Sequence, residues 1–243
     1  MDLYTTTRTI EMKKKAKIQG LICDLPLNEG GGLRAFDKTN QTLTPSVVAG
    51  TGYRIYTRGS CVEFKGVTTD KVTIGKPAKL NLQTSPMTIS LWVWFTSVSN
   101  YRYILSDYNA AGNAAQFALI LNNTNRFTFF WVTGGTQSPN PTTAQGSTVA
   151  TAGVWYHVVG VRGGVTGAWK SCIYVNGLFE KETATAGNPG SQALSGDATV
   201  GQPGSFVSAS LAMNGYINDV KIFDRALTQN EIMALYIEGR NKY

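Results

Sequence analysis

Residues 215–236, GYINDVKIFDRALTQNEIMALY, join a strand pattern directly to the start of a helix. A glycine leads an alternation of apolar and polar side chains, which is the period of a β-strand. Thr228 then stands three residues before Glu231, which is the spacing of a capping box at a helix N-terminus. Leu227 and Ile232 occupy the positions of a hydrophobic staple on either side of that cap. The stretch therefore predicts a strand followed by a short helix that packs onto a sheet.

The predicted helix has one apolar face, formed by Ile232, Leu235 and Tyr236. Gly239 follows this face, and a glycine just beyond a helix commonly adopts the left-handed conformation that ends it. We therefore expect the helix to terminate at Gly239.

The rest of the chain reads as short strands separated by glycine, asparagine, proline and threonine. MTISLWVWF, residues 87–95, alternates strictly, with five apolar side chains on one face. The opposite face of that strand carries Thr88, Ser90, Trp92 and Trp94. Asn176 and Gly177 predict a two-residue hairpin, because both turn positions need positive φ.

Composition supports an all-β fold in one domain. Of the 243 residues, 42% are hydrophobic and only 15% are charged, so the surface is covered mainly by hydroxyls and amides. All-β sandwiches of this size often form single domains, and we expect one domain over residues 20–243. Polar stretches at 133–150 and 183–196 predict exposed loops. Three widely spaced cysteines predict buried free thiols: Cys23, Cys61 and Cys172.

Residues 1–19 read as an arm with a basic excess, within a chain of net charge +7. The basic residues of the arm are Arg8, Lys13, Lys14, Lys15 and Lys17. A solvated arm is the simplest interpretation, and an acidic protein surface is the expected partner if it binds. No nucleic-acid-binding signature is present. The chain shows neither a secretory signal nor a run long enough for a membrane span, so we expect it to be made in a cytosol.

Several segments resemble, in order, the laminin G-like and pentraxin-like jelly rolls of the concanavalin A-like lectin/glucanase superfamily. They are LPLNEGGGLRAFDKTNQ (25–41), CVEFKGVTTDKVTIG (61–75), MTISLWVWF (87–95), VWYHVVGVR (154–162), IYVNG (173–177) and the closing stretch 215–236. The resemblance covers roughly residues 20–238. It implies a two-sheet antiparallel β-sandwich, and members of the superfamily bind sugars, bind proteins or fill structural roles.

Some of these relatives are glycosidases, whose chemistry needs two carboxylates that face one substrate. No acidic residue occurs between Asp107 and Glu180, so the central strands cannot supply the pair. Glu180 and Glu182 share a strand face but lack the further acid of the glucanase pattern. The only histidine, His157, matches a family position where the residue looks structural. The sequence therefore predicts a domain that is not an enzyme.

Many members of the family hold a structural Ca²⁺, and the resemblance assigns this role to Asp37, Asn218 and Asp219. Calcium prefers several hard oxygen ligands with carboxylates among them. Asn218 stands where the family commonly carries aspartate, and Lys65 also replaces a common family aspartate. The sequence therefore favours a weakened or lost calcium site, and ordinary turn hydrogen bonds are the alternative role of these residues.

Trp94 and Trp92 are the first candidates for ligand binding, because they lie on the otherwise polar face of the strand at 87–95. Aromatic rings on such a face suggest a partner. Tyr108 and Asn109, in the loop SDYNAAGN, are the second candidates. Core packing is the competing interpretation for each aromatic residue.

Two functional classes follow from this pattern. A jelly roll of this kind normally works outside the cell, and virions assemble inside the cell and act outside it. We therefore predict a non-catalytic recognition domain on a larger assembly, such as a phage capsid or tail decoration protein at the virion surface. Its arm would contact protein subunits, and one sheet face could bind glycan. The alternative is a stand-alone carbohydrate- or receptor-binding module, and a glucanase-like enzyme is the weakest hypothesis.

Overall fold

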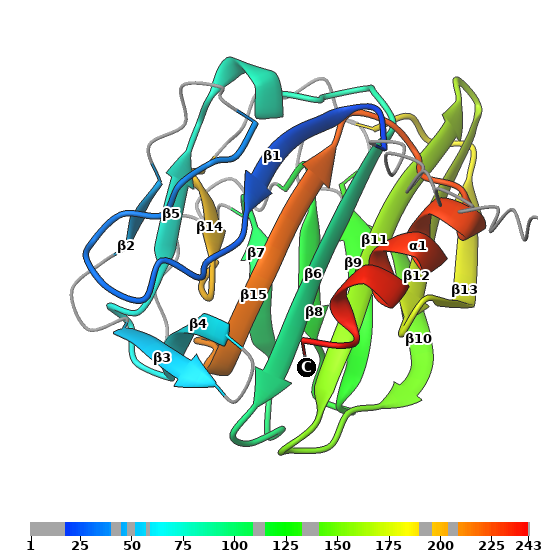
Figure 1. Cartoon of the computed structure of the whole chain (residues 1–243). Coiled ribbons are helices and arrows are strands. Elements are labelled where there is room, and N and C mark those ends of the chain that lie inside the picture. The colour runs from blue at the N-terminus through cyan, green and yellow to red at the C-terminus, as the bar shows by residue number, and fades with distance from the viewer. Residues whose placement is uncertain are drawn as a thin grey trace, which may run out of the picture.

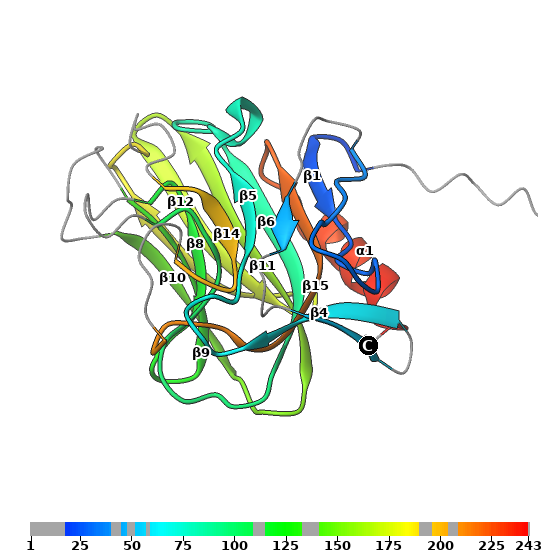
Figure 2. The ribbon, with the colours of Figure 1, turned by 90° about the vertical axis from the view of Figure 1, so that its left-hand side faces the viewer.

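The computed structural model describes residues 18–39, 45–47, 52–56, 59–108, 115–132, 141–189, 196–203 and 209–242. Within these residues, two antiparallel sheets stack face to face, and one α-helix lies on the outer face of one sheet (Figures 1 and 2). The architecture confirms the predicted all-β sandwich with a C-terminal helix.

One sheet has eight strands, and its pairings are all antiparallel. Its order is β13 (Leu178–Thr185), β12 (Ala168–Val175), β11 (Trp155–Val165), β6 (Met87–Phe95), β15 (Asn214–Phe223), β4 (Gly59–Lys65) and β3 (Gly52–Tyr56), with β1 (Leu21–Leu25) also paired to β15.

The other sheet has seven strands and lies behind the first in Figure 1. Its order is β10 (Thr142–Val149), β9 (Arg126–Trp131), β8 (Ala118–Leu121), β7 (Arg102–Ser106), β14 (Ala198–Val200), β5 (Val72–Gly75) and β2 (Ser46–Val47). A short 3₁₀ turn, η1 (Ala78–Leu80), leads toward β6.

The main hydrophobic core fills the space between the sheets. The apolar face of β6 is completely buried there, which confirms its predicted alternation; its members are Met87, Ile89, Leu91, Val93 and Phe95. From β9, Phe127, Phe129 and Trp131 point into the same core. All three cysteines are buried free thiols, as predicted.

A second apolar cluster joins the helix α1 (Gln229–Gly239) to the outer face of the eight-stranded sheet. Its members are Val159, Val161, Cys172, Phe223, Leu227, Ile232 and Leu235. The predicted capping box is present: Glu231 donates its backbone N–H to the Thr228 side chain, and its carboxylate accepts the Thr228 N–H at 2.9 Å. The closing stretch therefore forms the strand and capped helix that its pattern predicts.

The helix ends at Gly239, as expected, but the predicted left-handed conformation of this glycine is wrong. Gly239 stays helical, and the following residue, Arg240, also has right-handed angles, with φ −54° and ψ −24°. A Cβ on Gly239 would lie 2.6 Å from Cε2 of Trp92. The glycine therefore permits close approach of the helix to the sheet and does not form a left-handed turn.

The hairpin at Asn176 and Gly177 is confirmed, with φ of 51° and 77° at the two residues. The loops predicted at 133–150 and 183–196 include residues that the structure places in strands. β10 lies inside the stretch 133–150 and pairs with β9, and β13 continues to Thr185. β10 buries Thr142 and Ala144, so its inward side chains alternate but are small. The polar composition of this segment therefore did not predict a strand. Residues 133–140 and 190–195 lie outside the described part.

The arm residues Arg8, Lys13, Lys14, Lys15 and Lys17 also lie outside the described residues. The boundary predicted at residue 19 therefore stays a prediction. Within the described residues, no helix combines the length and the apolar character that crossing a bilayer requires.

Candidate functional site

A row of aromatic side chains crosses the outer face of the eight-stranded sheet. Trp94 of β6 pairs in register with Trp155 of β11 on one side and with Tyr216 of β15 on the other. Directly opposed residues of antiparallel strands point to the same face, so the three side chains lie next to one another. The ring centroids of Trp94 and Tyr216 are 5.0 Å apart. Each of the three side chains is partly exposed.

The next row along the same strands lies beneath α1. Trp92 is only 4% exposed, and its ring stacks on Tyr236 of the helix with a centroid distance of 5.8 Å and an interplanar angle of 21°. The ring of His157 lies 5.3 Å from Trp92 and 6.0 Å from Tyr236. The helix thus covers this row and ends beside the exposed aromatic row.

A hollow of about 430 Å³ lies where the exposed row meets the end of the helix. We call it the aromatic hollow. Its lining residues are Trp92, Trp94, Gly153, Val154, Trp155, Asn176, Tyr236 and Arg240. They come from β6, the turn before β11 and the first residue of β11, the β12–β13 hairpin, and α1 with the residue that follows it. The aromatic hollow is large enough for a sugar ring or another small ligand, which places it within the usual size of ligand sites.

The chemistry of the aromatic hollow suits a ligand with a flat apolar face and polar edges. Indole rings of Trp94 and Trp155 offer broad apolar surfaces with N–H groups at the edge. Asn176 is held in place because its Oδ1 accepts the backbone N–H of His157 at 3.0 Å. Arg240 adds a guanidinium, which is always charged in proteins.

The sequence-predicted ligand residues separate into two places. Trp92 and Trp94 both line the aromatic hollow, although the helix covers most of Trp92. Tyr108 follows β7 in the other sheet and lies against Tyr103, with ring centroids 5.7 Å apart. Asn109 lies outside the described residues. The structure therefore does not bring Tyr108 into the hollow.

Four aromatic or polar lining residues were not predicted as ligand contacts from the sequence: Trp155, Asn176, Tyr236 and Arg240. Trp155 joins the site only through the pairing of β11 with β6. Tyr236 and Arg240 are four residues apart, so the predicted helix already places them on one face. What that face meets could not be read from the sequence.

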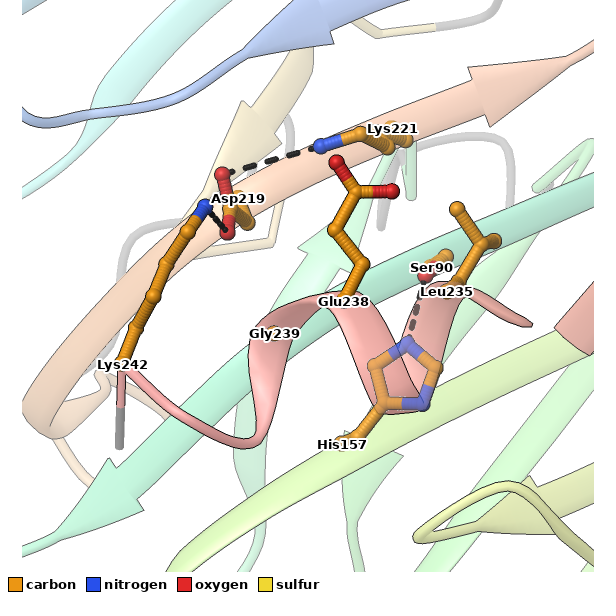
Figure 3. Close-up of a pocket in the computed structure, with 8 residues that line it drawn as sticks. All are labelled: Ser90, His157, Asp219, Lys221, Leu235, Glu238, Gly239 and Lys242. Carbon is orange, nitrogen blue, oxygen red and sulfur yellow. Dashed lines mark hydrogen bonds and ion pairs between the residues drawn. The ribbon is translucent and has the colours of Figure 1, made fainter. Parts of the chain in front are cut away.

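A small polar cluster lies under α1 beside the aromatic hollow (Figure 3). Nε2 of His157 and Oγ of Ser90 are 2.9 Å apart and share a hydrogen bond. Both residues are at most 2% exposed, and the adjoining void has a volume of only about 20 Å³. Burial, together with the smaller effect of the positive charge of Lys221, lowers the pKa of His157 to about 3. The burial of this pair matches the packing role that the sequence predicts for His157.

The acidic pair on β13 is bound to its surroundings. The Glu180 carboxylate accepts the backbone N–H groups of Ser147 at 2.9 Å and Thr148 at 3.2 Å, both on β10. Glu182 forms an ion pair with Lys170 at 2.9 Å. Glu180 therefore ties the edges of the two sheets together, whereas Glu182 is paired with a neighbouring strand of its own sheet.

The first calcium candidate, Asp37, does not fit a calcium ion. Its Oδ2 lies 2.9 Å from the ammonium of Lys79, and the side chain of Asp37 is fully buried. Its Oδ1 accepts backbone N–H groups of Asp24 at 2.9 Å and Thr39 at 3.1 Å. Although burial opposes ionisation, the bonds from Lys79, Asp24 and Thr39 outweigh it and hold the pKa of Asp37 below its usual value. The Lys79 ammonium thus already pairs with the carboxylate that a calcium ion would have to bind.

The other two calcium candidates are also engaged with protein groups. Asp219 lies 2.9 Å from Lys242 and 3.6 Å from Lys221 (Figure 3). Asn218 donates its side-chain N–H to the carbonyl of Ser60. Among the described residues, no group of three or more His, Cys, Asp or Glu side chains could hold a metal. These residues therefore match the ion-pair and turn roles better than a calcium site.

Comparison with solved structures gives the same architecture. The binding domain of botulinum neurotoxin serotype G is similar with a TM-score of 0.63 at 14% identity, covering 90% of this chain and 51% of that one. The binding domain of Paraclostridial Mosquitocidal Protein 1 gives 0.68 at 13% identity, with 91% and 53% covered. The chain thus spans about half the length of these toxin domains.

A third similar structure is domain 4 of AbnA, a GH43 extracellular arabinanase from Geobacillus stearothermophilus, in complex with arabinotriose. It gives a TM-score of 0.58 at 14% identity, covering 89% of this chain and 98% of that one. At such identities the likeness concerns the fold alone.

Curated protein sequences give no match to this chain. A family model, Laminin_G_3, described as the concanavalin A-like lectin/glucanases superfamily, matches residues 65–233, which is more than half of the chain. That range includes β6, β11, the hairpin and the start of α1, the elements that carried the resemblance seen in the sequence. The chain therefore belongs to the Laminin_G_3 family of the concanavalin A-like lectin/glucanase superfamily.

Proposed function

We propose that this chain is a lectin-like recognition module that binds carbohydrate in the aromatic hollow and has no catalytic activity. The observation that carries the proposal is the exposed aromatic row, in which Trp94 and Trp155 lie side by side at the end of a helix. Sugar rings have apolar C–H faces that pack well on indole rings, and their hydroxyls pair with polar groups at the rim.

Two further findings support this proposal. The arabinanase domain with the same fold was solved with arabinotriose, and it matches this chain over nearly its whole length. The acidic residues on β13 are engaged with β10 and with Lys170, which argues against a glycosidase carboxylate pair.

The experiment is a glycan array with the purified full-length protein, once with calcium and once with chelator. Trp94→Ala is the test variant, and Phe36→Ala is its control, because Phe36 is a 63% exposed aromatic residue outside the hollow. We expect binding that Trp94→Ala loses and Phe36→Ala keeps, with the same signal in chelator. An array without signal for the wild-type protein, or a signal unchanged by Trp94→Ala, would contradict the proposal.

Display on a virion stays a separate prediction. The similar toxin and arabinanase domains favour a carbohydrate- or receptor-binding module over an assembly component. The basic residues that would contact an assembly fall outside the described part of the chain. Deletion of residues 1–17 tests the idea, because loss of assembly binding with retained glycan binding would support it and unchanged assembly binding would oppose it.

A further inference from the structure

The aromatic hollow contains one fixed positive charge and no negative one. Among its described lining residues, Arg240 is the only ionised side chain. The Arg240 side chain is exposed, and its guanidinium makes no hydrogen bond and no ion pair with the described part of the chain. The neighbouring cations are already paired: Lys242 lies 2.9 Å from Asp219, and Lys221 lies 3.3 Å from Asp24.

The other polar groups of the hollow are mainly hydrogen-bond donors. Oδ1 of Asn176 accepts the backbone N–H of His157, and the amide NH₂ of the same side chain is a donor. An indole N–H can only donate, and Nε1 of Trp155 is buried, so Trp155 adds its ring face and not a donor. The Tyr236 hydroxyl can donate as well as accept.

A site rich in hydrogen-bond donors favours a sugar that carries a carboxylate over a neutral sugar. Neutral sugars present many hydroxyl protons, which need acceptors such as carboxylates in the site. The described lining of the hollow has no carboxylate. A carboxylate group presents only acceptors, and a guanidinium can bind it through two parallel hydrogen bonds.

We infer that the aromatic hollow takes a sugar that carries a carboxylate, a hexuronic acid or a sialic acid. The carboxylate lies on Arg240, and the sugar ring packs against Trp94 and Trp155. This inference rests on the proposed glycan-binding function and adds the charge of the ligand. Arg240 is the residue that determines specificity, and the tryptophans supply affinity for any ring.

The test compares two matched pairs of probes by titration of tryptophan fluorescence. One pair is trigalacturonate and its methyl ester, and the other is sialyllactose and lactose, so the two sources of the carboxylate are distinguished. We expect the acidic member of at least one pair to bind about tenfold tighter than its neutral partner, as a charge-assisted bidentate contact implies. Arg240→Gln removes that preference.

Arg34→Gln is the matched control, because Arg34 is exposed, lies outside the hollow and loses the same charge. It should keep the preference within about twofold, which excludes a general effect of net charge. Equal binding of acidic and neutral members, lost in Trp94→Ala, overturns this inference and leaves the proposed function standing. A preference that survives Arg240→Gln also overturns it. Failure of every probe to bind at millimolar concentration, together with an empty glycan array, overturns both.

Discussion

At the scale of single residues, His157 shows how burial sets chemistry in this protein. Its ring lies beside those of Trp92 and Tyr236 and shares a hydrogen bond with Ser90. Desolvation lowers its pKa to about 3, so it is neutral in the folded protein at neutral and mildly acidic pH. An unfolded chain titrates its histidine near pH 6.5. Between these values the unfolded state binds the extra proton, and stability therefore falls as the pH falls.

We predict that the difference in unfolding free energy between wild type and His157→Gln shrinks by about 2 kcal/mol between pH 7 and pH 5. Urea denaturation at both pH values measures it. Asp107 has the opposite effect on the pH dependence of stability, because burial raises its pKa to about 6. Both proteins contain Asp107, so its contribution cancels in the comparison. Parallel pH profiles for the two proteins would show that His157 is not buried as a neutral ring.

At the scale of elements, the contact between α1 and β6 places the candidate site. The capping box starts the helix, and Arg225 donates to the carboxylate of its third helical residue, Glu231, at 2.9 Å, which lowers the pKa of Glu231 to about 2. The other end of the helix approaches the sheet closely at Gly239, against the ring of Trp92. This approach stacks Tyr236 on Trp92 and brings Arg240 to the rim of the aromatic hollow.

Gly239→Ala should destabilise the protein by about 1–3 kcal/mol, because the added methyl group overpacks the helix against Trp92. Helix propensity alone predicts the opposite sign, a gain of up to about 1 kcal/mol. Urea denaturation of the variant measures the sign directly. Gly31→Ala is the control, since its Cβ would have no atom within 4 Å and we expect a change below about 0.5 kcal/mol. A more stable Gly239→Ala protein would contradict the close packing.

At the scale of the whole molecule, buried cations hold the sandwich together. Arg162 of β11 is 1% exposed and donates to the backbone carbonyls of Ser85 at 2.8 Å and Gln116 at 3.0 Å, which join distant segments. Lys79 binds Asp37 in the opening segment, and Lys221 of the closing strand lies beside Asp24. Lysine ammonium groups thus provide the positive charge that the family resemblance assigns to calcium.

We therefore expect the thermal midpoint of the wild-type protein to be the same in calcium and in chelator. Lys79→Met should lower the unfolding free energy by roughly 3 kcal/mol, because it leaves the buried carboxylate of Asp37 without its cation. Lys38→Met, at an exposed lysine, is the control and should change it by less than about 0.5 kcal/mol. A wild-type midpoint that rises with calcium would show that an ion, and not Lys79, neutralises Asp37.

The sequence by itself determined the local structure. Alternation in residues 87–95, positive φ at Asn176 and the capping box at Thr228 depend on neighbours along the chain, and the structure confirms each. The polar strand β10 was missed, because its inward side chains are small and its pairing with β9 gives it the strand conformation.

Tertiary structure alone decided which aromatic residues form the site. Trp92 and Trp94 share one face of one strand, yet α1 covers the first and leaves the second partly exposed. Trp155 and Tyr236 reach the same hollow through strand pairing and helix packing between segments far apart in the sequence. The roles of Gly239 and Lys79 likewise follow from groups brought close only by folding. Periodicity and caps are local properties of a chain, whereas exposure and charge pairing depend on which distant surfaces meet.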